Sequence, residues 1–147
     1  LADGTIDIVA TDHAPHTLEE KSQSYEKCPS GGPLVQHTLP AALEMVHQGI
    51  FTLEMIVEKM SHNVAGLYQI PDRGFIKKGF KADCVLVDLN SPWLATDEDS
   101  LYKCKWTPFH GATFQSKVLK TWVNGICVFD EGNWNETIKG QALTFSR

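Results

Sequence analysis

The chain has 147 residues, of which 42% are hydrophobic and 21% are charged, as is ordinary for a globular domain. Its net charge of -5 offers no basic surface to neutralise phosphates, so we expect no nucleic-acid partner. No apolar run approaches the roughly 20 residues that cross a bilayer, so no membrane partner is expected. No signal peptide opens the chain, which predicts a cytoplasmic protein. The chain begins at Leu1 rather than at a Met, which predicts a piece of a longer protein.

The four cysteines also favour a reducing compartment. None of them forms a C-x-x-C pair, which argues against a finger-type zinc cluster, so free thiols are expected. Cys84 and Cys127 lie in apolar runs and are predicted to be core residues.

The first predicted element is a strand over Ile6–Ala10, which stops at Asp12. An apolar run of this length is typical of a buried strand in a parallel sheet. In barrels of alternating strands and helices, the chemistry lies where strands end. We therefore expect Asp12 and His16 to lie where a substrate binds.

A long polar loop is predicted over Thr17–Gln36, and long loops in compact domains are often functional. A helix is expected from about Thr38, which could cap it, to Gly49. A second helix should follow the cap Thr52, and a short third segment covers Ser61–Tyr68.

From Pro71 onward the pattern favours strands. Buried strands are predicted over Ala82–Leu89 and Lys117–Val123, and Asn124-Gly125 predicts a hairpin into the next apolar run. We expect residues 1–70 to form an αβ part and residues 71–147 a β-rich part.

The residues around Asp12 leave several chemical interpretations open. Asp12 could ligate a metal, act as a general base, or simply cap a loop. His13 and His16 have Pro15 between them, which favours an extended loop over a shared metal. His16 could then bind an anion or lie at the surface. Ser30-Gly31-Gly32 offers backbone amides to a polar ring, or forms an ordinary turn.

Several motifs together resemble the C-terminal part of a dihydroorotase, a cyclic amidohydrolase. The most specific is the run Ala10-Thr11-Asp12-His13-Ala14-Pro15-His16, and the resemblance covers essentially the whole chain. The supporting motifs are Glu19-Glu20-Lys21, Pro29-Ser30-Gly31, Asn63-Val64-Ala65, residues 74–83, Thr107-Pro108-Phe109 and Val123-Asn124-Gly125. The implied α/β fold is the C-terminal portion of a (β/α)8 TIM-type barrel plus part of a small β-sandwich.

The resemblance also implies residue roles. Asp12 corresponds to an aspartate that ligates zinc and acts as general base and acid. His16 corresponds to the residue that binds the substrate carboxylate, and Ser30 and Gly31 to the backbone pair that contacts the ring. The implied reaction is the reversible hydrolysis of (S)-dihydroorotate to N-carbamoyl-L-aspartate in pyrimidine biosynthesis.

The chain departs from the family pattern in its metal ligands. It has no H-x-H pair, and only Asp12 remains of the zinc ligands, whereas zinc sites usually need three or more protein ligands. We therefore expect this chain alone to lack zinc and activity. Alternatives are another cyclic amidohydrolase, such as an allantoinase or dihydropyrimidinase, and a non-catalytic structural or regulatory partner. Uncovered apolar faces also predict a homo-oligomer, or disorder near Leu1.

Overall fold

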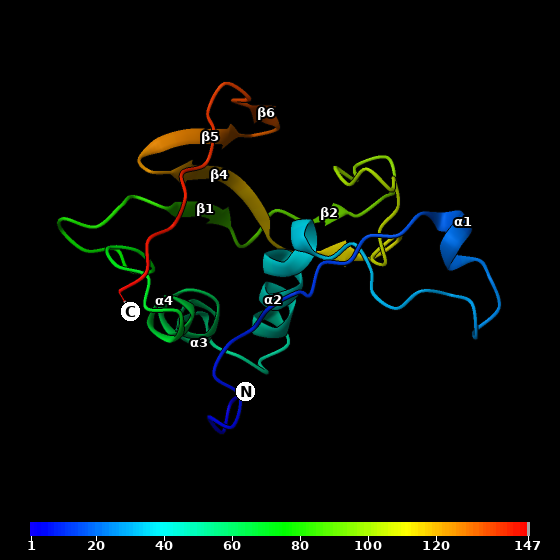
Figure 1. Ribbon diagram of the computed structural model, residues 1–147, viewed down its shortest axis with the longest axis horizontal. Coiled ribbons are helices and arrows are strands. Elements are labelled where there is room, and N and C mark those ends of the chain that lie inside the picture. Colours follow the sequence, from blue (N-terminus) through cyan, green and yellow to red (C-terminus); the bar gives the residue numbers. More distant parts are fainter. Residues whose placement is uncertain (147) are drawn as a thin grey trace.

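The helices and strands of the chain occupy different parts of the sequence. The computed structural model describes residues 1–146 and has its helices before residue 68 and its strands after residue 83. The helical elements are α1 (Leu18–Lys21), the 3-10 turn η1 (Val35–His37), α2 (Thr38–His47), α3 (Leu53–Val57), the π-helical turn η2 (Glu58–His62) and α4 (Asn63–Leu67). In Figure 1, α2 lies centrally, α3 and α4 lie beside it, and α1 lies at the far end of a loop. The predicted boundary near residue 70 remains a prediction.

Two antiparallel sheets make up the later part of the chain. The larger has the strand order β1-β4-β5-β6, and the smaller pairs β2 with β3. The strands are β1 (Cys84–Asp88), β2 (Trp93–Leu94), β3 (Thr113–Phe114), β4 (Lys117–Val123), β5 (Ile126–Asp130) and β6 (Asn133–Trp134). Cys84 lies opposite Trp122, and Val123 lies opposite Ile126. The prediction of a strand over Lys117–Val123 is confirmed, whereas the short strands β2, β3 and β6 were not predicted.

The Asn-Gly hairpin is confirmed between β4 and β5. Asn124 and Gly125 have φ angles of 52° and 80°, as the tight two-residue hairpin turn requires. The backbone N–H of Asn124 donates to Asp83 Oδ1 at 2.7 Å, and its side-chain oxygen accepts from Arg73 Nη2 at 2.6 Å. Arg73 also pairs with Asp83. Charged groups thus fix the end of the hairpin against the turn that follows the helices.

The helical predictions are confirmed in their extent and corrected in one cap. Thr52 caps α3, because its hydroxyl accepts the N–H of Met55 at 3.2 Å. Thr38 does not cap α2: His37 occupies the cap position, and the Thr38 hydroxyl donates to the Leu34 carbonyl at 3.0 Å. The reason is that η1 runs directly into α2, so Thr38 already lies inside helical backbone. The predicted loop Thr17–Gln36 likewise contains α1 and part of η1.

The predicted buried strand over Ile6–Ala10 is wrong. This segment is extended but belongs to no sheet, and Ile6 is 53% exposed. Its polar backbone groups bond to η2 instead, since Lys59 Nζ donates to the Ile6 carbonyl at 2.8 Å and the Val9 N–H donates to the Lys59 carbonyl at 3.1 Å. A parallel strand needs a neighbouring strand, and none of residues 1–146 supplies one beside this segment.

The main core is an aromatic cluster around His37, where α2 meets the smaller sheet. His37 is fully buried, and its ring stacks on Trp93 and Phe114 at centroid distances of 6.0 Å. Its Nδ1 lies 3.2 Å from the Tyr102 hydroxyl and 3.3 Å from the Thr107 hydroxyl. This cluster joins the start of α2 to residues far along the chain.

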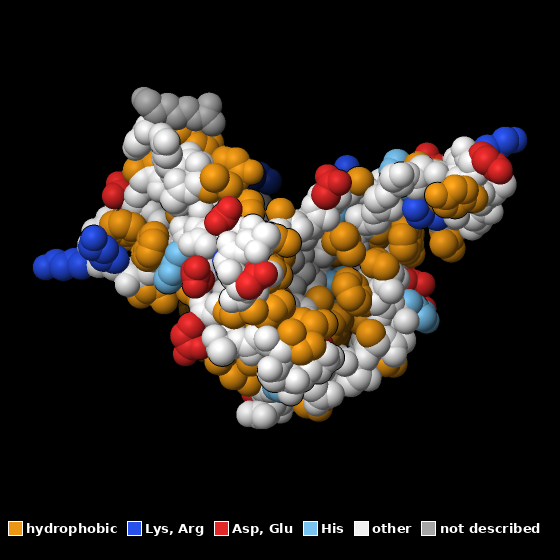
Figure 2. Space-filling view, turned by 90° about the horizontal axis from the view of Figure 1, so that it is seen from below, with side chains coloured by type: hydrophobic (Ala, Val, Ile, Leu, Met, Phe, Trp, Pro, Cys, Tyr) orange, Lys and Arg blue, Asp and Glu red, His pale blue; other side chains and the backbone are white. Residues whose placement is uncertain are grey.

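Outside this cluster many apolar side chains remain exposed. The predicted strand over Ala82–Leu89 forms as β1, but it is not buried, because Val85 and Leu86 are 47% and 46% exposed. The cysteines are free, as predicted, but Cys84 and Cys127 are only half-buried and are not core residues. Figure 2 shows apolar side chains gathered on the face that carries the helices. Exposed apolar side chains gathered on one face are typical of an interface.

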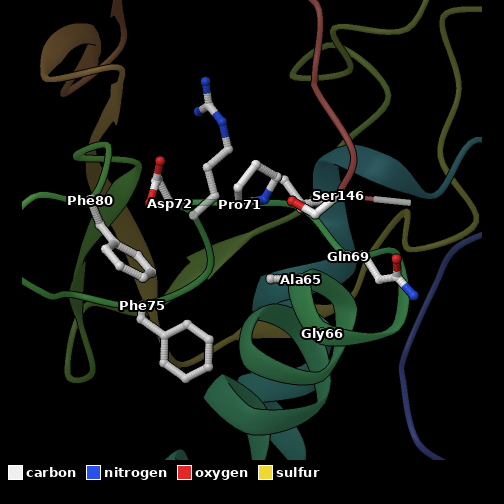
Figure 3. Close-up of a pocket in the computed structure, with 10 residues that line it drawn as sticks. Ala65, Gly66, Gln69, Pro71, Asp72, Phe75, Phe80 and Ser146 are labelled. Atoms are coloured by element: carbon white, nitrogen blue, oxygen red, sulfur yellow. The ribbon is translucent and has the colours of Figure 1, made fainter.

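A pocket of about 360 Å³ lies at the junction of α4, the following turn and the C-terminal tail. Figure 3 shows Phe75 and Phe80 on one side and Gln69 and Ser146 on the other. The Ser146 N–H donates to the Gln69 carbonyl at 2.9 Å, which ties the tail to α4. Within the described residues, the pocket has none of the predicted site residues in its lining.

No helix within residues 1–146 has the length and apolar character to cross a bilayer.

We expect His37 to make the stability of the chain pH-dependent. Burial lowers the pKa of His37, and this outweighs the opposing effect of the Asp99 carboxylate. The unfolded chain therefore takes up a proton below pH about 6.5 while the folded chain resists it, so stability is full above this pH and lost below it. Between pH 8 and pH 5 the free energy of unfolding should fall by up to about 2 kcal/mol from this residue.

Urea unfolding at both pH values checks this expectation. His37→Gln should flatten the pH dependence, because it removes the buried imidazole. An unchanged slope in His37→Gln would contradict the assignment.

Candidate active site

The structure brings together the two segments that carry the predicted site residues. Asp12 and His16 lie on the first segment, and Ser30 and Gly31 lie on the second. The Ala14 N–H donates to the Gly32 carbonyl at 3.2 Å. Residues nearly twenty positions apart along the chain therefore lie side by side.

Asp12 has an unusual backbone and a free carboxylate. Its φ angle is 45°, in the left-handed region that few non-glycine residues adopt. The side chain is exposed, and among residues 1–146 it has no hydrogen-bond or ion-pair partner. An exposed carboxylate without a partner is free to act on a ligand, so Asp12 remains a candidate for function. The loop-cap interpretation of Asp12 finds no support in these contacts.

His16 lies against the start of α1. Its Nδ1 is 3.7 Å from Glu20 Oε2, and α1 begins with a capping box in which Thr17 and Glu20 bond reciprocally. The Thr17 backbone N–H, at 2.8 Å, and then the Thr17 hydroxyl lower the pKa of Glu20, with a further contribution from His16. The sequence Thr17-Leu18-Glu19-Glu20 carries the capping-box signature, so this helix could have been predicted.

Gly31 is required by its surroundings. Its φ angle is 91°, and a Cβ there would lie 2.6 Å from Ala14 Cβ. Lys21 Nζ donates to the Pro29 carbonyl at 2.7 Å and to the Gly31 carbonyl at 3.1 Å, which fixes the turn. Ser30 lies exposed at this turn. The close approach of the two segments thus depends on the missing side chain.

His13, whose role the sequence left open, ties the two segments together. Its Nδ1 accepts the backbone N–H groups of Leu34 at 3.1 Å and Val35 at 3.4 Å. An accepting Nδ1 is unprotonated, so this geometry assigns the ring proton to Nε2. His13 therefore links the two segments through its ring.

The described residues do not fit a complete metal centre. No group of three or more His, Cys, Asp or Glu side chains within residues 1–146 is arranged to hold a metal ion. Asp12 is at most one ligand, and a zinc site needs several. The arrangement by itself offers a free carboxylate, an imidazole and a turn with accessible backbone amides.

The profile of the amidohydrolase family matches residues 1–128. The chain belongs to the amidohydrolase family. Among curated amidohydrolase relatives, the dihydroorotase of Anaplasma phagocytophilum is 38% identical over 129 residues, which are 88% of this chain and 29% of that protein. The dihydroorotase of Halobacterium salinarum is 39% identical over 132 residues, 88% of this chain and 31% of that protein.

Solved amidohydrolase structures agree with the predicted fold. The L-hydantoinase (dihydropyrimidinase) from Arthrobacter aurescens superposes with a TM-score of 0.83 at 29% identity, over 90% of this chain and 31% of its own. This confirms the α/β fold class. The chain spans about 30% of the length of the relatives that it matches, from 29% to 31%.

Sequence reasoning missed the residues that contact the candidate site from elsewhere in the chain. Trp106 donates its indole N–H to the His16 carbonyl at 2.7 Å, and Tyr102 lies against His13 with ring centroids 5.2 Å apart. Nothing in the local sequence around either residue signals these contacts, because the partners are about ninety positions away.

Proposed function

We propose that the chain is part of a dihydroorotase, which hydrolyses the cyclic amide of (S)-dihydroorotate reversibly to N-carbamoyl-L-aspartate in pyrimidine biosynthesis. The observation that carries the proposal is the surface formed by Asp12, His16 and Gly31, in a chain 38% identical to a curated dihydroorotase over 129 residues. The molecule that this surface would bind is a small-molecule substrate.

Each group of this surface suits one need of the reaction. Hydrolysis of a ring amide requires a base for the attacking water and an acid for the leaving nitrogen, and the unpaired Asp12 carboxylate suits both steps. The ring of His16 is half-buried and suits the substrate carboxylate as a hydrogen-bond donor. The Ser30–Gly31 turn is exposed, so its backbone groups are accessible to a polar ring.

Zinc belongs to the proposal for the complete enzyme rather than for these residues alone. Zinc would supply an activated water and a polarised carbonyl. Asp12 would be one ligand, and the remaining ligands would come from residues outside this chain. This explains why the described residues do not fit a closed zinc site.

A zinc measurement tests this division of the metal site. The 147-residue chain should carry less than about 0.1 zinc ion per molecule after equilibration with zinc and desalting, because one carboxylate does not hold the ion. Mass spectrometry of the intact chain with elemental analysis gives the stoichiometry. Zinc at one ion per chain, lost in Asp12→Asn, would contradict the proposal.

A substrate panel tests the activity. The complete polypeptide that contains these residues should hydrolyse dihydroorotate in preference to allantoin and dihydrouracil, because His16 favours a substrate with a carboxylate. Preference for dihydrouracil would instead support a dihydropyrimidinase, which the likeness to the L-hydantoinase (dihydropyrimidinase) from Arthrobacter aurescens keeps as the second candidate.

The same assay tests whether this chain is inactive on its own. Dihydroorotate hydrolysis by the 147-residue chain above a metal-only control, abolished by Asp12→Ala, would overturn the proposal that it is an incomplete enzyme. Loss of all three activities in the complete polypeptide would favour a non-catalytic partner.

A further inference from the structure

The loop over residues 96–110 reaches back to the candidate site through Trp106. The Trp106 indole N–H donates to the His16 carbonyl at 2.7 Å, the shortest indole hydrogen bond in the described part of the chain. The same ring lies beside Gly32, where an added Cβ would be 3.8 Å from its Cη2 atom. One half-buried side chain thus contacts both segments of the site.

The loop itself is held rigidly. The Thr107 N–H donates to Asp97 Oδ1 at 2.8 Å, and the buried Ser100 hydroxyl donates to the Trp106 carbonyl at 3.3 Å. Gln36, just after the second segment, donates from Nε2 to the Asp99 carbonyl at 2.9 Å and accepts the Leu101 N–H at 2.9 Å. Trp106 is therefore presented from a fixed support.

Tyr102 forms a second link from this loop. Its buried hydroxyl accepts the Gln36 N–H at 2.8 Å and lies 3.2 Å from His37 Nδ1. Its ring packs against His13, whose Nδ1 accepts the N–H groups after Gly32. The loop therefore contacts the Asp12–His16 segment at two places, the His13 ring and the His16 carbonyl.

We propose that Trp106 is a positioning residue that holds the His16 main chain, and so the His16 ring, in the orientation that binds the substrate carboxylate. This inference rests on the proposed function. Trp106 bonds to the His16 main chain and acts through His16. Loss of the Trp106 hydrogen bond should therefore weaken substrate binding and leave the chemical step at Asp12 nearly intact.

Trp106→Phe in the complete enzyme tests the proposal, because it keeps an aromatic ring and removes the N–H donor. Loss of one hydrogen bond should raise KM for dihydroorotate about 3- to 10-fold, with kcat within about twofold. Trp93→Phe is the matched control, because Trp93 also donates its indole N–H to a main-chain carbonyl, that of Ser116 at 2.9 Å. Trp93→Phe should leave KM for dihydroorotate unchanged.

A double-variant cycle distinguishes positioning from a general structural effect. If Trp106 acts through His16, adding Trp106→Phe to His16→Ala should raise KM no further. The same KM increase in both backgrounds, or an unchanged KM in Trp106→Phe, would overturn the inference while the proposed function stands. A wild-type complete enzyme without dihydroorotate hydrolysis would overturn the proposed function, and this inference with it.

Discussion

Asp12→Asn in the complete enzyme is expected to lower kcat for dihydroorotate hydrolysis by about 10²- to 10⁴-fold, the range for loss of a general acid-base group. Asn keeps the size of the side chain and tolerates the left-handed backbone that Asp12 adopts at φ 45°. The substitution therefore removes the carboxylate charge with little change in conformation. Steady-state kinetics measure the effect, and zinc analysis shows how much of it comes from loss of the metal.

Asp72→Asn is a matched control for this prediction. Asp72 is also exposed and left-handed, with φ 57°, but it lies at the turn after α4 rather than on the candidate site. Its substitution should leave kcat unchanged. Equal loss in both variants, or near-normal kcat in Asp12→Asn, would show that Asp12 is not the general base.

Gly31→Ala is expected to disrupt the site and to destabilise the fold. The added Cβ would lie 2.6 Å from Ala14 Cβ and 3.1 Å from the Ala14 carbonyl oxygen, and φ is 91°. The segments must separate or the turn must change, at a cost of about 2 to 4 kcal/mol when collision and backbone strain are combined. Thermal or urea unfolding measures this cost, and KM for dihydroorotate should rise as the turn moves.

Two further variants separate collision from backbone strain. Gly132→Ala has a similar φ of 96° but no atom within 4 Å of the added Cβ, so it should lose only about 1 to 2 kcal/mol. Ala14→Gly should partly rescue Gly31→Ala, because it removes the nearest atom. Equal costs at Gly31 and Gly132, with no rescue by Ala14→Gly, would mean that the two segments are not in contact.

The β4–β5 hairpin and the helices from α2 to α4 were predictable because their signals are local. Asn124-Gly125 between apolar runs determines a hairpin through backbone angles that these two residues tolerate, and the structure has those angles. Thr52 acts within one turn of a helix, so its effect also follows from nearby sequence. The prediction that Thr38 caps α2 failed because it overlooked η1, which runs directly into α2.

The failures concern residues whose environment comes from distant parts of the chain. The run Ile6–Ala10 has the pattern of a buried strand, but strand formation needs a neighbour, and here η2 takes up its backbone groups through Lys59. Cys84 and Cys127 have core-like sequence neighbours, but the sheet leaves them half-buried. An apolar sequence pattern alone does not determine whether other residues will cover that side of the strand.

By itself, the sequence determined the motif from Asp12 to His16, because residue type limits chemistry. The tertiary structure decided that the two segments meet, through the bond from Ala14 to Gly32, and that Trp106 and Tyr102 support them. The physical reason is that hydrogen bonds and packing act over a few ångströms in space, whatever the separation along the chain. Trp106 and His16 are neighbours only once the chain has folded.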